Sequence, residues 1–63
     1  MLSTDALERL FDELALAIDA AGPRNEALFL TKLTLALANQ LGDEGLVREQ
    51  IVLAGKHLPP TET

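Results

Sequence analysis

Residues 25–41 carry apolar side chains around almost the whole circumference of the helix that their spacing predicts. One stripe of this helix consists of Phe29, Leu30, Leu33, Leu37 and Leu41, with Ala36 beside it. A second stripe joins Leu28 and Leu35, which lie far around the helix from the first. A helix that is apolar on nearly every side is normally surrounded by protein. Two helices of the same short chain cover two of its sides, so we expect the remaining side to contact another subunit or another protein.

The short length of the chain supports the same expectation. A chain of 63 residues buries only about 60% of the surface that its unfolded form exposes, and the usual remedies for the resulting low stability are disulfides, metals or oligomerisation. The sequence has no Cys and a single His, so oligomerisation is the remedy left to it. The mean hydropathy of +0.16 is high for a small monomer. A well-packed monomeric three-helix bundle is the alternative.

Composition predicts helices throughout. Fourteen Leu and nine Ala stand against four Val and Ile together, and unbranched side chains favour helix whereas β-branched ones favour strand. Residues 4–21 form the first predicted helix, with Ser3, Thr4 and Asp5 as possible N-caps. Its apolar positions follow the spacing of one buried stripe. They are Leu7, Leu10, Phe11, Leu14, Ala17, Ile18 and Ala21, and only Leu16 lies off the stripe.

Glycine, proline and capping residues separate the expected helices. Gly22-Pro23 ends the first helix, and Asn25 is the expected N-cap of the second, with Pro23 as its first residue in the alternative. Gly42 ends the second helix and Asp43 caps the third, so these two residues define the second turn.

The third predicted helix spans residues 43–57, unless Gly55 ends it earlier. In that alternative, Lys56 and His57 complement the helix dipole from just beyond the end. Its apolar stripe consists of Val47, Ile51, Ala54 and Leu58, flanked by Leu46 and Leu53. Residues 59–63 are expected to form a flexible tail after a single helical domain over residues 1–58.

Three helices of similar length joined by short connections predict an all-α fold, a small three-helix up-down-up bundle completed by oligomerisation. The candidate interface residues are the large apolar side chains outside the main stripes. They are Leu28, Leu35, Leu16, Leu46 and Leu53.

The charge and the apolar runs exclude several kinds of partner. The net charge of −5 disfavours nucleic acid, because such binding requires clustered Lys and Arg. The first residues lack the basic region of a signal peptide, and the most apolar stretch, residues 27–41, is too short for a transmembrane helix. We therefore expect a soluble cytoplasmic protein that binds neither nucleic acid nor membranes.

The histidine and the carboxylate residues of this sequence do not form the pattern of a catalytic or metal site. His57 lies near the chain end beside Lys56 and is interpreted as solvated or dipole-complementing, in preference to a base, haem ligand or metal ligand. The carboxylate pairs Asp12-Glu13 and Asp43-Glu44 point in different directions on helices, so neither faces a common site. We expect no catalytic residues, no cofactor, no metal and no enzyme activity.

Asn39 is the one polar residue of the second helix whose position suggests a role. It lies four residues before Asp43. The preferred interpretation is a surface side chain that hydrogen-bonds the turn. The alternative is an interhelix or intersubunit hydrogen bond that fixes register.

The segment Leu33 to Ala54 resembles a family of small bacterial proteins, catalogued as domain of unknown function 2783. The residues that carry the resemblance are Ala38, Asn39, Leu41, Gly42, Asp43 and Ala54, and the similarity covers residues 5–56. The resemblance implies a short all-helical protein with no assigned activity. Members of the family are often encoded near flavin-dependent aromatic hydroxylases, which implies an accessory role.

Three hypotheses of function follow. The first is a helical interaction module that self-associates or docks on a larger enzyme as an accessory subunit. The second is a carrier that binds a small apolar ligand between helices lined by Leu and Phe. The third is a free-standing enzyme, which requires a polar site assembled across subunits.

Overall fold

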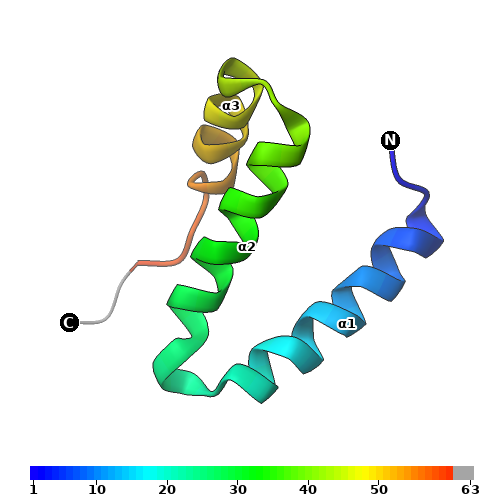
Figure 1. Cartoon of the computed structure of the whole chain (residues 1–63), viewed down its shortest axis with the longest axis vertical. Coiled ribbons are helices and arrows are strands. Elements are labelled where there is room, and N and C mark those ends of the chain that lie inside the picture. Colours follow the sequence, from blue (N-terminus) through cyan, green and yellow to red (C-terminus); the bar gives the residue numbers. More distant parts are fainter. Residues whose placement is uncertain (61–63) are drawn as a thin grey trace.

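The computed structural model describes residues 1–60, and these residues form an all-α structure (Figure 1). Helix α1 spans Thr4–Ala21, a 3₁₀ turn η1 spans Pro23–Asn25, α2 spans Glu26–Leu41 and α3 spans Glu44–Ala54. Successive helices run in opposite directions, as the up-down-up prediction requires. Of the expected tail, Pro59 and Pro60 have no regular secondary structure, and residues 61–63 lie outside the described part.

Helix α1 begins and ends at residues that the sequence marks for those positions. Of the three candidate caps, Ser3 is the N-cap, and its Oγ accepts a hydrogen bond from the backbone N–H of Ala6 at 3.1 Å. At the other end, the N–H of Gly22 donates to the carbonyl oxygen of Ile18 at 3.2 Å. Gly22 has a φ of 84°, a value that favours glycine, so the chain leaves the helix here.

The connection from α1 to α2 combines the two alternatives that the sequence allows. Pro23 is the first residue of η1, and Asn25 occupies the N-cap position of α2. The Asn25 side chain, however, donates from Nδ2 to the carbonyl oxygen of Ala21 at 3.2 Å. It makes no capping hydrogen bond to the first turn of α2. The amide thus ties the end of α1 to the start of α2.

Two residues connect α2 to α3, as predicted. Gly42 is left-handed, with φ 71° and ψ 18°, and its N–H donates to the carbonyl oxygen of Ala38 at 2.9 Å. Asp43 is the N-cap of α3. Such a short connection fixes the direction in which α3 leaves α2.

Helix α3 is shorter than the predicted span of residues 43–57. Gly55 caps its end, and the N–H of Gly55 donates to the carbonyl oxygen of Ile51 at 3.1 Å. His57 then has a φ of 60°, which a right-handed helix does not allow. The earlier of the two expected ends is therefore the one in the structure.

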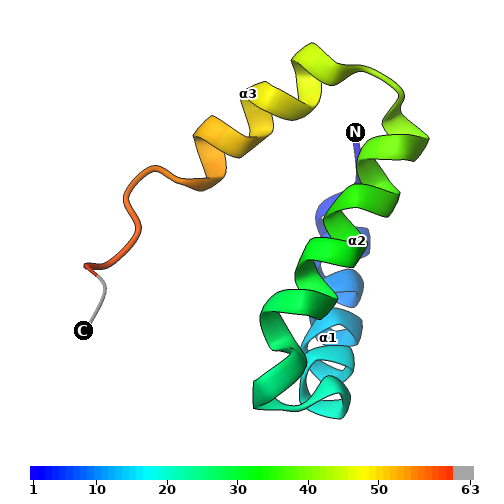
Figure 2. The same ribbon diagram turned by 60° about the vertical axis from the view of Figure 1, so that its left-hand side comes forward.

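The three helices are splayed apart. Helix α1 contacts α2 and α2 contacts α3, but no contact joins α1 to α3 within residues 1–60. In the second view, α3 leans away from α2, and α1 lies behind α2 (Figure 2). No residue among 1–60 is buried. The best-covered large side chains are only partly buried; they are Leu14, Ile18, Phe29, Leu30, Leu33 and Val47.

The open arrangement is also evident in the dimensions of the chain. The radius of gyration is 13.4 Å, whereas a compact chain of this length has about 11 Å. The accessible surface is 5983 Å², and a compact monomer of the same mass has about 4,000 Å². One chain therefore exposes about 2,000 Å² more than a compact fold of its size.

Candidate functional site

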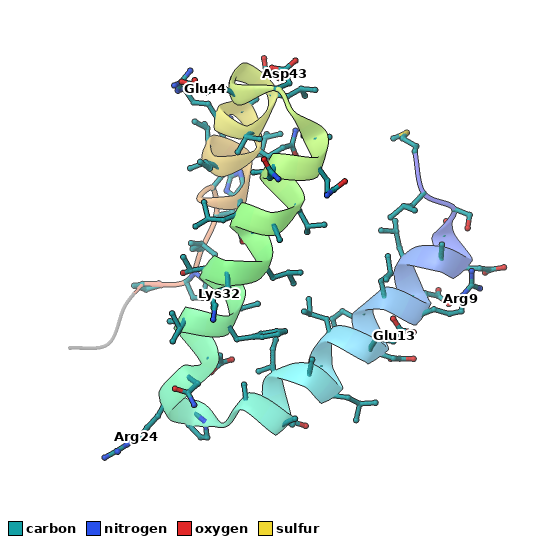
Figure 3. The ribbon with its side chains drawn as sticks, viewed as in Figure 1. Arg9, Glu13, Arg24, Lys32, Asp43 and Glu44 are labelled. Carbon is teal, nitrogen blue, oxygen red and sulfur yellow. The ribbon has the colours of Figure 1, made fainter. Side chains whose placement is uncertain are left out.

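The most prominent feature of the surface is its content of large apolar side chains, which project from all three helices (Figure 3). Scattered apolar residues are normal on a protein surface, but extended apolar patches mark interaction sites. The exposed large hydrophobic residues are Met1, Leu2, Leu7, Leu10, Phe11, Leu16, Leu28, Leu35, Leu37, Leu41, Leu46, Ile51, Val52, Leu53 and Leu58. These side chains form the candidate functional surface.

The first part of this surface lies between α1 and α2. Leu14 on α1 and Leu33 on α2 are partly buried, and the two helices contact each other near the turn. Leu7 and Leu10 lie on the same face of α1 as Leu14, and Leu37 lies on the same face of α2 as Leu33. We call the apolar faces that meet at this angle the hairpin wedge. Its open end is exposed, because the helices diverge away from the turn.

The spacing of the apolar residues in α1 therefore predicts correctly which face of the helix packs, but it does not predict how much of that face is buried. The stripe was expected to be buried, yet Leu7, Leu10 and Phe11 are exposed. The physical reason is that only the turn-proximal half of α1 contacts α2 and that α3 contacts neither half. No signal in the sequence shows this, because periodicity indicates which face packs and not what covers it.

The second part of the surface lies on the far side of α2. Leu28 and Leu35 are 58% and 65% exposed, as candidate interface residues must be. The other candidates, Leu16, Leu46 and Leu53, are exposed as well. Exposure alone does not distinguish these residues from the main stripes, since Leu37 is 60% exposed. The assignment of these five residues to an interface stays a prediction.

Two threonines make the surface of α2 more apolar than its sequence implies. The Oγ1 of Thr31 donates to the carbonyl oxygen of Ala27 at 2.8 Å, and the Oγ1 of Thr34 donates to that of Leu30 at 2.7 Å. Each hydroxyl is thus satisfied within the helix. Either side chain can enter an apolar contact without leaving an unpaired donor.

Charged groups gather on the outer side of α1. Residues 1–21 carry five acidic and one basic residue, a formal net charge of −4. Arg9 and Glu13 both point away from α2 (Figure 3). At the start of α3, Glu44 forms an exposed ion pair with Arg48. The charges therefore border the apolar faces without entering the hairpin wedge.

The turn between α2 and α3 forms two open hollows. One, of about 540 Å³, is lined by Ala38, Asn39, Gly42, Asp43, Glu44, Val47, Arg48 and Ile51. The other, of about 470 Å³, is lined by Thr34, Leu37, Ala38, Gln40, Leu41, Val47 and Gln50. No hydrogen bond joins the Asn39 side chain to another residue of the described chain, so its proposed bond to the turn is not seen.

The titratable side chains are dispersed. Among residues 1–60, no group of three or more His, Asp and Glu could hold a metal ion. His57 is exposed in the turn after α3. Of the predicted carboxylate pairs, Asp12 and Glu13 are exposed on α1, while Asp43 caps α3 and Glu44 pairs with Arg48.

The chain matches no protein-family model, and no curated protein or solved structure matches it. The resemblance of residues 5–56 to domain of unknown function 2783 stays a prediction. Within residues 1–60, none of the helices has both the length and the apolar character of a membrane span.

Proposed function

We propose that this chain is a helical interaction module, whose core is completed by helices of another polypeptide. The observation that carries the proposal is the absence of any buried residue among residues 1–60 together with the exposure of large apolar side chains on every helix. Burying apolar surface stabilises a fold by about 25 cal/mol per Å², so this exposed surface is a strong driving force for association.

The proposal includes two kinds of partner: a further copy of the chain, or a larger enzyme that the chain serves as an accessory subunit. The second stripe of α2 supports a docking role, because Leu28 and Leu35 lie apart from the contact with α1 and are exposed. The predicted family resemblance supports an accessory role beside a flavin-dependent enzyme. The proposal assigns no reaction and no cofactor to this chain, and its cytoplasmic location stays a prediction.

Sedimentation velocity and light scattering of the purified chain at micromolar concentrations test the proposal, combined with affinity capture from the native cell. We expect a mass above 6.8 kDa or capture of a defined partner in stoichiometric amount. A stably folded monomer that captures no partner contradicts the proposal.

A second candidate function is a carrier for a small apolar ligand. The observation in its favour is the apolar hollow between α2 and α3, whose lining includes Leu37, Leu41 and Val47. Its volume of about 470 Å³ lies in the range of ligand sites, but such sites enclose most of the ligand and this hollow is open. A thermal-shift series with aromatic and fatty-acid ligands tests it, and the absence of any shift contradicts it.

A further inference from the structure

We infer that the hairpin wedge is filled by the hairpin wedge of a second copy of this chain, so that two α1–α2 hairpins form a four-helix dimer. The inference rests on the proposed function and names its partner. Leu7, Leu10 and Leu37 are the central contact residues, because they extend the packed faces of Leu14 and Leu33 into the open end.

The chain's own third helix does not fill this wedge. The connection of Gly42 and Asp43 directs α3 away from α1, and no contact joins these two helices within the described residues. None of the described helices therefore fills the wedge, and a second copy is the occupant that we assign to it.

The exposed area of the chain is of the size that pairing with a second copy can bury. One chain exposes 5983 Å², about 2,000 Å² more than a compact monomer of its mass, which amounts to about 4,000 Å² for a pair. Obligate homodimers bury about 2,000–5,000 Å² in total. This excess counts the whole chain, α3 included, and the part of it that lies on α1 and α2 is within the range that a single additional copy covers.

The distribution of charge also favours the hairpin wedge as the face that meets a second copy. A two-fold dimer brings identical surfaces together, so a charged face meets its own sign. The outer side of α1 belongs to a segment of net charge −4 and would repel its copy. Leu7, Leu10 and Leu37 introduce no such repulsion, and helical hairpins of similar length pair readily into four-helix bundles.

Sedimentation equilibrium of the full chain tests the inference, with Leu10→Asp as the test variant and Val52→Asp as its control. Leu10 lies on α1 alone, whereas Leu37 also lines the hollow between α2 and α3. Val52 is 57% exposed and lies on α3, outside the wedge. We expect a wild-type dimer, a dissociation constant raised at least about 100-fold by Leu10→Asp, and little change with Val52→Asp. A Leu10→Asp chain that stays dimeric overturns the inference but leaves the proposed function standing. A folded wild-type monomer overturns the inferred dimer. The affinity-capture experiment then shows whether the chain binds another protein, as the proposed function requires.

Cross-linking keeps the inference testable if the Leu10→Asp chain does not fold. The chain contains no Cys, so a single introduced Cys forms disulfides only between chains. Under mild oxidation, a mixture of Leu10→Cys and Leu37→Cys chains should give a covalent dimer, whereas Leu16→Cys chains, altered on the opposite face of α1, should stay uncoupled. Equal or preferential coupling through Leu16→Cys overturns the inference and indicates an interface on the outer face.

Discussion

The carboxylate of Asp43 accepts a hydrogen bond from the backbone N–H of Leu46 at 3.0 Å, three residues further along the chain. This bond caps α3 immediately after the turn that separates it from α2. The cap satisfies one of the free N–H groups in the first turn of α3 and so stabilises the start of this helix.

Replacing Asp43 by alanine should therefore destabilise α3. The loss of an N-cap side chain costs about 1 kcal/mol, whereas Asp43→Asn retains an acceptor and should change the free energy of unfolding by only a few tenths. Urea titration followed by circular dichroism at 222 nm measures both variants. Equal stability of the Ala and Asn variants would show that the hydrogen bond to Leu46 makes no net contribution.

The two glycines around this turn should respond to alanine in opposite directions. Gly42 has a φ of 71° and open space where a Cβ would lie, so Gly42→Ala is opposed only by the backbone, at about 1 kcal/mol. Gly45 is helical, and its added Cβ would lie 3.5 Å from Oδ1 of Asp43, an ordinary contact. Gly45→Ala should stabilise the chain by about 0.5 kcal/mol.

Thermal unfolding of the two variants under identical conditions is the measurement. Gly42→Asn serves as the matched control, because asparagine tolerates the left-handed region better than alanine and should lower the stability less. A melting temperature raised by Gly42→Ala would be incompatible with the left-handed turn.

Much of this local structure is predictable from the sequence, because it depends on neighbouring residues. The all-α class, the reversal of direction at each turn, the cap at Asp43 and the end of α2 at Gly42 all follow from spacing and from single-residue preferences. The ambiguity at Gly55 is of the same kind, since a glycine near a helix end is compatible with either boundary.

The relative placement of the helices is not predictable in this way. The spacing of Leu7, Leu10 and Leu14 identifies one face of α1, but only Leu14 is partly covered in the single chain. Coverage depends on contacts between distant residues and on other chains, which hydrophobic periodicity does not encode. For the same reason, the distinction between a core stripe and the interface residues Leu28 and Leu35 stays a prediction.

Aspartate substitutions on the two stripes of α2 should separate folding from association. Leu33 is partly buried, so Leu33→Asp places a charge in a partly covered site and should unfold the chain. Leu28→Asp and Leu35→Asp alter exposed positions and should weaken association while the helical signal is retained. Circular dichroism and light scattering on the same samples distinguish the two effects. If Leu28→Asp and Leu35→Asp leave association unchanged, the second stripe of α2 is not an interface.

Thermal stability should also depend on protein concentration. If a second copy completes the core, folding is coupled to association and dilution favours the unfolded chain. For two chains of 63 residues, the unfolding enthalpy of about 0.7 kcal/mol per residue implies a melting temperature that rises by about 6 °C for each tenfold increase in concentration. Differential scanning calorimetry across a hundredfold concentration range measures this slope, with Val52→Asp as a control that should retain it. A melting temperature independent of concentration would mean that the isolated chain unfolds as a monomer, and the partner would then have to be a different protein.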